Sequence, residues 1–178
     1  MKVDEIRKQF PALSQEVYGN KLVYFDNAAT SQRLAAVIEY QDRIAFGPNA
    51  NIHRAVHKLA IEATKEYEET RDAVRESINA SSREEIVFTS GTTQSINLVA
   101  NCFGDAFINP GDEVIVSESE HHSNIVPWQI MCNRWGAVLR VLPVDDEGHI
   151  RLDILEALLS DRTKILAITQ QAAAMSCT

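Results

Sequence analysis

The sequence predicts an α/β protein with a largely parallel sheet. From residue 86 onward, short apolar runs of strand length alternate with segments in which apolar residues recur every three or four positions. This alternation is typical of parallel strands joined by crossover helices. The 178 residues suffice for one domain with a sizeable core, and no repeat, low-complexity stretch or interdomain linker interrupts them.

The first half of the chain is predicted to be mainly helical. Residues 4–10 are expected to form a short amphipathic helix that ends at Pro11. Residues 22–25 (Leu-Val-Tyr-Phe) have the composition of a brief strand before a turn. Helical spacing continues over residues 33–46 and over residues 56–78, where the Glu, Lys and Arg residues between the apolar positions indicate a solvated face.

The second half is expected to alternate strictly between strand and helix. Strands are predicted at residues 86–89, 114–116, 137–142 and 165–169, and helices at 94–102, 125–135 and 152–159. Ligands of open α/β sheets bind at the carboxyl ends of the strands. The loops that follow these strands are therefore the candidate functional segments.

Charge and composition exclude several classes of function. The net charge of -8 argues against a nucleic-acid partner, because phosphate backbones attract basic surfaces. Charged residues within the first eight positions do not fit a secretion signal, and no apolar run approaches the ~18–20 residues that span a bilayer. We expect a cytoplasmic protein without a membrane partner. Cys102, Cys132 and Cys177 show no metal or redox spacing, and the first two are predicted to be small buried residues of helices.

The first candidate site is the segment Thr-Ser-Gly-Thr-Thr at residues 89–93, between a predicted strand and a helix. A small loop that opens a helix offers free backbone N–H groups and the positive end of the helix dipole, which together bind phosphate. Gly91 permits close backbone approach, and the threonine hydroxyls add donors without charge. The alternative is a plain helix cap made by Thr92 or Thr93.

The second candidate is Glu-His-His-Ser-Asn at residues 120–124, after the next strand. It should lie at the same end of the sheet as the threonine segment, where one imidazole can stack on a planar ring or transfer a proton. The alternative is a helix cap by Ser123 with two incidental histidines. A metal site is not expected, because neighbouring histidines point apart and no acidic or Cys partner has helical spacing. His53 and Arg54 could serve an anionic ligand.

Four motifs together resemble a known family. They are Tyr-Phe-Asp-Asn-Ala-Ala-Thr at 24–30, Asn-Ile-His-Arg at 51–54, Gly-Thr-Thr at 91–93 with Ile-Asn-Leu-Val-Ala at 96–100, and Glu-His-His-Ser-Asn-Ile-Val-Pro-Trp-Gln at 120–129. In this order they resemble the class V aminotransferase superfamily, and within it the SufS/CsdA-like cysteine desulfurases. The resemblance covers residues 1–169, and the last motif is its most specific part.

The resemblance implies a fold-type-I transferase with pyridoxal 5′-phosphate (PLP) at a dimer interface, here with an incomplete large-domain sheet and flanking helices. Thr92 and Thr93 match residues that contact the PLP phosphate. His121 matches the histidine that stacks over the pyridine ring and can help proton transfer. Related aminotransferases usually have an aromatic residue there, so His121 favours a desulfurase. The residues that match the substrate side are Ala28, Ala29, Asn51 and His53.

The activity implied by the resemblance converts L-cysteine to L-alanine and passes the sulfur to an enzyme cysteine as a persulfide, for Fe–S cluster assembly. It further implies a homodimer and a sulfur-acceptor protein. The alternatives are a selenocysteine lyase or another class V PLP enzyme, such as a sulfinate desulfinase, and a non-catalytic truncated product. The sulfur acceptor and the preference between cysteine and selenocysteine stay open.

The resemblance is lost near residue 170. Residues 1–169 are interpreted as the N-terminal part of the class V domain and residues 170–178 as a divergent tail, in which three alanines at 172–174 replace a Ser-Asn-Val-Leu-Gly-like stretch. The Schiff-base lysine and nucleophilic cysteine of the family fall beyond this chain, and Cys177 does not match the nucleophile. We therefore expect the chain alone to be inactive and its tail to be read from a shifted frame.

Overall fold

The computed structural model describes residues 2–47 and 49–169. The chain forms two compact units, residues 1–87 and the part from Phe88 onward. The expectations for the tail, including its boundary at residue 170, its alanines and Cys177, lie outside the described residues.

The first unit is mainly helical, as predicted. Its elements are α1 (Val3–Arg7), the 3-10 helix η1 (Pro11–Ser14), β1 (Glu16–Val17), β2 (Asn20–Lys21), α2 (Ala35–Phe46), α3 (Lys58–Ser77) and the 3-10 helix η2 (Arg83–Glu85). The predicted helices over 33–46 and 56–78 are confirmed with slightly later starts. The first helix stops at Arg7, earlier than predicted.

The predicted strand at residues 22–25 is wrong. The segment forms no ladder with any described residue, and the pairing nearest to it in the chain is the two-residue hairpin of β1 and β2. Its backbone makes isolated bonds instead: the Leu22 N–H donates to the Gln15 carbonyl at 3.0 Å, and Arg7 Nη2 donates to the Leu22 carbonyl at 2.6 Å. Asn27 Nδ2 donates to the Tyr24 carbonyl at 3.4 Å. An apolar run becomes a strand only where a partner strand is available.

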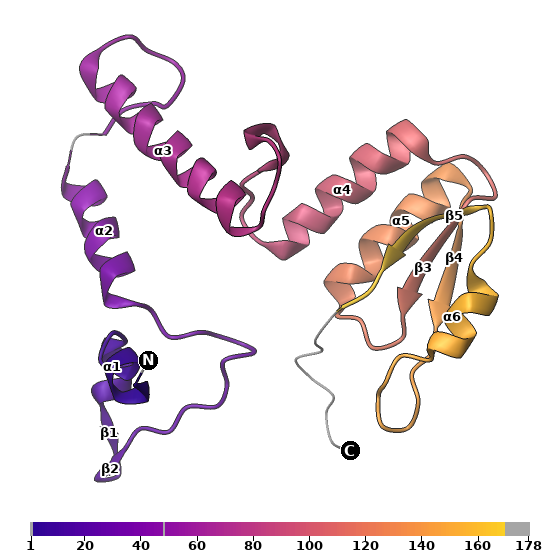
Figure 1. The fold of residues 1–178 in the computed structure, drawn as a ribbon, viewed down its shortest axis with the longest axis horizontal. Coiled ribbons are helices and arrows are strands. Elements are labelled where there is room, and N and C mark those ends of the chain that lie inside the picture. The colour runs from indigo at the N-terminus through magenta and orange to yellow at the C-terminus, as the bar shows by residue number, and fades with distance from the viewer. Residues whose placement is uncertain (1, 48, 170–178) are drawn as a thin grey trace. The chain divides into compact units, whose positions relative to one another are not determined.

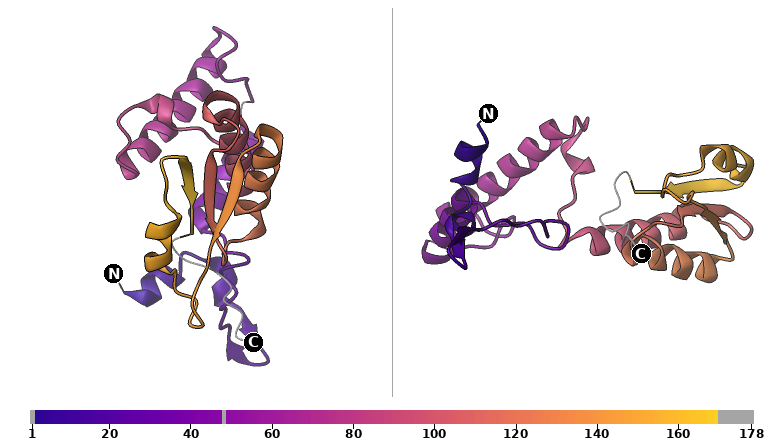
Figure 2. Two further views of the ribbon diagram at one scale, coloured as in Figure 1. Left: turned by 90° about the vertical axis from the view of Figure 1, so that its right-hand side faces the viewer. Right: turned by 90° about the horizontal axis from the view of Figure 1, so that it is seen from below.

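The second unit contains a parallel sheet, which confirms the predicted α/β fold class. Its elements are α4 (Thr92–Phe107), β3 (Glu113–Ser117), the 3-10 helix η3 (His122–Asn124), α5 (Val126–Trp135), β4 (Val138–Leu142), α6 (Leu152–Leu158) and β5 (Thr163–Ala167). The strand order is β4-β3-β5, and both pairs are parallel. Helices α4 and α5 lie on one face of the sheet and α6 on the other (Figures 1 and 2).

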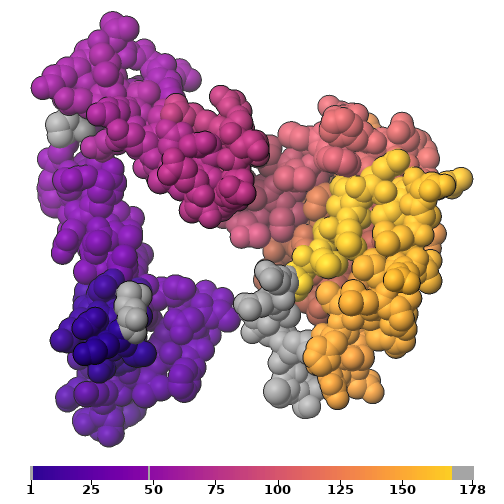
Figure 3. Space-filling view, viewed as in Figure 1, coloured from indigo at the N-terminus to yellow at the C-terminus, as the bar shows by residue number. Residues whose placement is uncertain are grey.

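The core of this unit lies between the sheet and the pair α4–α5. Val114 and Val116 of β3 pack against apolar residues of the two helices, which are Ala100, Trp128, Met131 and Cys132. Gly104 makes close helix packing possible, because a Cβ at this position would lie 2.7 Å from Met131 Cγ and from Trp135 Nε1. On the opposite face, α6 and β5 lie at the molecular surface (Figure 3), and their residues Leu152 and Leu166 are exposed.

Two further sequence predictions are wrong, at least in part. Residues 86–89 form no strand, although Ile86 is buried, because no described strand pairs with them. Cys132 is buried as predicted, but Cys102 is exposed. The buried positions of α4 are Ala100 and Gly104, one helical turn apart, and Cys102 lies on the opposite side of the helix.

Candidate functional site

The N-terminus of α4 is open. Its cap residue is Gly91, with φ 152° and ψ 175°, a backbone conformation that only glycine adopts readily. Among the described residues, none accepts a hydrogen bond from the backbone N–H groups of Thr92 or Thr93. The interpretation of either threonine as the helix cap is therefore wrong, and the start of α4 presents two free donors with the positive end of the helix dipole.

The loop after β3 orients His121. His121 is the cap residue of η3, and its Nδ1 accepts a hydrogen bond from the Ser123 backbone N–H at 3.1 Å and lies 2.8 Å from Ser123 Oγ. The alternative in which Ser123 is the cap is wrong, because Ser123 is the donor. With Nδ1 serving as acceptor, the neutral ring carries its proton on Nε2.

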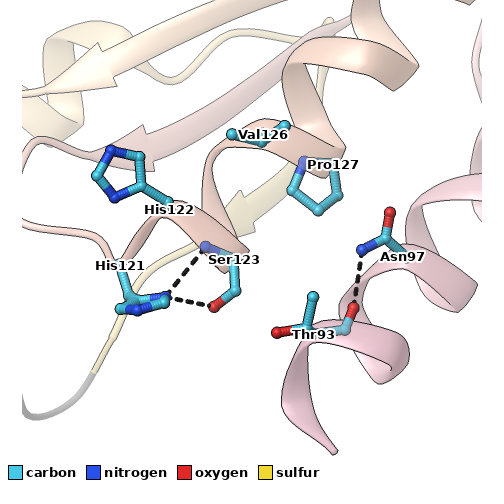
Figure 4. Close-up of a pocket in the computed structure, with 7 residues that line it drawn as sticks. All are labelled: Thr93, Asn97, His121, His122, Ser123, Val126 and Pro127. Carbon is cyan, nitrogen blue, oxygen red and sulfur yellow. Dashed lines mark hydrogen bonds between the residues drawn. The ribbon is translucent and has the colours of Figure 1, made fainter.

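The two candidate segments meet at one cavity. It has a volume of about 290 Å³ and is lined by Thr93, Asn97, His121, His122, Ser123, Val126 and Pro127 (Figure 4). The predicted proximity of the threonine segment and the histidine pair is confirmed for Thr93 and His121. The cause differs from the predicted one, because α4 packs against α5 and η3 rather than following a strand of the same sheet. Thr92 directly precedes the lining residue Thr93 in the chain but does not line the cavity.

Three further residues of the lining had no role predicted from the sequence, although His122 lies in the predicted segment 120–124. Asn97 lies one turn after Thr93 on α4, and its Nδ2 donates to the Thr93 carbonyl at 2.8 Å (Figure 4). His122 and Pro127 also border the cavity. The four-residue spacing of Thr93 and Asn97 was the available signal, because residues at this spacing share a helix face.

A buried carboxylate behind the histidine loop was also missed. Glu120 is 9% exposed and accepts hydrogen bonds from Ser117 Oγ at 2.7 Å, the Thr169 N–H at 2.6 Å and Asn124 Nδ2 at 2.8 Å. Asn124 Oδ1 in turn accepts from the Trp128 indole N–H at 2.9 Å. The network joins the ends of β3 and β5 to η3 and α5.

The residues predicted for the substrate side belong to the first unit. Ala28 and Ala29 lie in an exposed turn in which the Ala29 N–H donates to the Asp26 carbonyl. Asn51 is exposed, and His53 has a left-handed backbone with its Nε2 3.1 Å from Glu68 Oε1. None of them lines the cavity of the second unit, and their substrate-side role stays a prediction.

Cys132 on α5 belongs to the hydrophobic core and does not line the cavity. Burial raises the pKa of the Cys132 thiol, which keeps it protonated and inert. Within residues 2–47 and 49–169, no three His, Cys, Asp or Glu side chains gather closely enough to share a metal ion. No helix in this part of the chain is long and apolar enough to cross a membrane.

The family is decided by the match of the chain to a family model. The model for aminotransferase class V matches residues 23–175. The chain belongs to the aminotransferase class V family. A cysteine desulfurase of Synechococcus elongatus is 49% identical over 168 residues, which are 94% of this chain and 27% of that relative.

Solved structures agree with this class V assignment. The cysteine desulfurase CsdA of Escherichia coli matches with a TM-score of 0.80 and 36% identity over 98% of this chain and 42% of that one. A C-DES variant with glycine covalently linked to its PLP cofactor shares the fold, with a TM-score of 0.68 and 21% identity over 91% of this chain and 40% of that one. The chain thus spans less than half the length of these relatives.

Proposed function

We propose that this chain contributes the phosphate-binding helix and the ring-stacking histidine of a PLP-dependent cysteine desulfurase. The observation that carries the proposal is the cavity in which Thr93, at the open start of α4, faces His121. Membership of the class V family and the desulfurase relatives support the same function.

The side chains at the cavity fit a phosphorylated pyridine. None of the lining residues is acidic, and the helix start offers N–H and hydroxyl donors without a neutralising carboxylate. The volume of about 290 Å³ lies just below the usual range for small-molecule sites, roughly 300–1,000 Å³. Thr92 and Thr93 would hold the phosphate, and the His121 ring would stack on the pyridine with its proton at Nε2.

PLP supplies an electron sink for reactions at an amino acid. The residues of this chain would bind and orient it, and His121 could hold or move a proton at the reacting face. Ala28, Ala29, Asn51 and His53 are proposed to shape the substrate side. No residue between 1 and 169 is proposed as the Schiff-base lysine or as the nucleophilic cysteine.

For the whole protein, the proposed reaction converts L-cysteine to L-alanine and passes the sulfur to an enzyme cysteine. We further propose that the whole protein is a cytoplasmic homodimer. It would deliver the sulfur to an acceptor protein for Fe–S cluster assembly. The test is to incubate a full-length protein containing this chain with L-cysteine or L-selenocysteine and to measure alanine. Equal or greater turnover of selenocysteine would favour a selenocysteine lyase, and absence of both would contradict the proposal.

Phosphate recognition can be measured on the chain itself. Pyridoxine 5′-phosphate lacks the aldehyde of PLP and cannot react with surface lysines, which makes it a clean probe. We expect it to shift the amide NMR signals of Thr92 and Thr93 and the ring signals of His121, whereas unphosphorylated pyridoxine should not.

The matched variants are Thr93→Val and Thr70→Val. Loss of the Thr93 hydroxyl should weaken pyridoxine 5′-phosphate binding by about 3- to 10-fold, the effect of one hydrogen bond. Thr70 bonds only within α3, to the Glu66 carbonyl, and its replacement should leave binding unchanged. Equal binding of the phosphorylated and unphosphorylated probes would contradict the phosphate assignment.

A further inference from the structure

The Glu120 network admits only one arrangement of donors and acceptors. The Trp128 indole is a donor only, so the oxygen of the Asn124 amide must face it and the Asn124 NH₂ must face Glu120. The other Glu120 oxygen lies against the Thr169 backbone N–H, which also can only donate. Both oxygens of Glu120 therefore have to accept, which a carboxylate does and an amide, whose nitrogen only donates, does not.

We infer that Glu120 is a positioning residue that holds the turn carrying His121 at the carboxyl end of the sheet. The bond between Glu120 and Asn124 closes this turn from both ends, and His121 and Ser123 lie inside it. The bonds to Ser117 and Thr169 attach the same carboxylate to the ends of β3 and β5. The His121–Ser123 bond and the distance of the imidazole from Thr93 thus depend on a carboxylate that does not line the cavity.

This role rests on the proposed function, since it concerns the histidine that would stack on the cofactor. Glu120 does not line the cavity, and neither do the residues that donate hydrogen bonds to it, which are Ser117, Asn124 and Thr169. A change at Glu120 should therefore alter the state of the His121 ring before any ligand is added.

Isosteric variants provide the test. In Glu120→Gln an NH₂ group must face either the Asn124 NH₂ or the Thr169 N–H, and in Asn124→Asp two carboxylates face each other. The double variant Glu120→Gln/Asn124→Asp restores every pairing, because the introduced carboxylate accepts both from the introduced amide and from the Trp128 indole. Net charge and volume are unchanged. Glu156→Gln, on the exposed side of α6, is the control.

The first readout is the tautomer of His121, measured by ¹⁵N NMR of the ligand-free chain under conditions in which circular dichroism shows a folded protein. We expect one Nε2–H tautomer in the wild type, the control and the double variant, and a mixture in each single variant. The second readout is binding of pyridoxine 5′-phosphate, which should weaken about tenfold in the single variants and recover in the double variant.

The outcomes separate the two proposals. A folded Glu120→Gln protein with the wild-type tautomer overturns the positioning role. A double variant that fails to fold, or that keeps mixed tautomers, also overturns the positioning role. The double variant therefore decides the question even if Glu120→Gln alone does not fold. If the tautomer follows the pattern but the wild type binds no pyridoxine 5′-phosphate, the positioning role stands and the proposed function fails.

Discussion

Glu113 shows how a single buried charge is accommodated at the start of the central strand. Its carboxylate accepts from Arg140 Nη2 at 2.5 Å and from Ser160 Oγ at 2.7 Å. The hydrogen bond from Arg140, followed by that from Ser160, lowers the pKa of Glu113 below its ordinary value. The carboxylate thereby joins β3 to β4 and to the segment before β5.

This residue should make stability depend on pH in the acid range. An unfolded Glu titrates near pH ~4.3, and the folded pKa lies lower, so between the two values the folded state binds fewer protons than the unfolded state. The contribution of Glu113 is thus complete above about pH 4.3 and is lost as pH falls through the folded pKa.

The expected result for Glu113→Gln is a lower free energy of unfolding at pH 7 and a weaker dependence on pH below about pH 5. Urea unfolding at several pH values measures both quantities. Glu156→Gln, an exposed carboxylate on α6, should keep the wild-type slope. Parallel curves for wild type and Glu113→Gln would show that the Arg140 bond does not stabilise the folded state.

At the scale of elements, the contact of α4 with α5 sets the geometry of the cavity, because Thr93 lies on the first helix and Pro127 on the second. Gly104 is the point of close approach. A change in helix separation at Gly104 would be transmitted along both helices toward the cavity.

Gly104→Ala should lower the free energy of unfolding. Alanine gains about 1 kcal/mol over glycine in a helix, but overpacking against Met131 and Trp135 costs about 1–3 kcal/mol. We expect a net loss of up to about 2 kcal/mol in denaturant unfolding. Asn101→Ala, at an exposed position of the same helix, should not destabilise. A Gly104→Ala protein more stable than wild type would show that the helices separate freely.

The elements that sequence predicted well are those with strong internal periodicity. Helices α2, α3 and α5 and strands β3, β4 and β5 lie within a few residues of their predicted bounds. The strand predictions for residues 22–25 and 86–89 are wrong because a strand forms only beside a partner strand, and a local sequence pattern does not show whether a partner is present. The predicted burial of Cys102 is wrong for a related reason, because the packing of α4 at Gly104 determines which side of that helix is buried.

For the site, sequence could predict that Thr93 and His121 lie close together, because each belongs to a loop motif with a local chemical signature. Their role in cofactor binding stays a prediction. Sequence could not predict Glu120, whose three donors come from Ser117, Asn124 and Thr169. The last of these is 49 positions away along the chain. Only the folded sheet brings donors so far apart in the chain together around one carboxylate.

At the scale of the molecule, the described part of the sheet in the second unit has two edges at which no further strand pairs. Within the described residues, β4 and β5 each pair only with β3, and apolar side chains such as Val141 on β4 are exposed. Unpaired edges bordered by apolar surface promote pairing with another chain. We expect self-association of this chain to increase with concentration.

Val141→Lys should reduce that association, because a charge on an exposed edge strand opposes pairing between chains. Val141 is 53% exposed, so lysine can be accommodated at this position without burial. Sedimentation velocity over a range of protein concentrations gives the measurement, with Val141→Thr as an uncharged β-branched control. Association that persists unchanged in Val141→Lys would place the contact elsewhere.

The central position of β3 has a consequence for the growing chain on the ribosome. All five residues of β3 are buried in the final sheet, but both neighbouring strands are made after it. Thr163 of β5 follows its partner Glu113 by 50 positions, which take roughly 2.5 to 10 s at about 5–20 residues per second. During these seconds, Val114, Ile115 and Val116 have no lateral partner on the β5 side. A nascent chain stalled before residue 163 should therefore bind holding chaperones more strongly than one that has released β5.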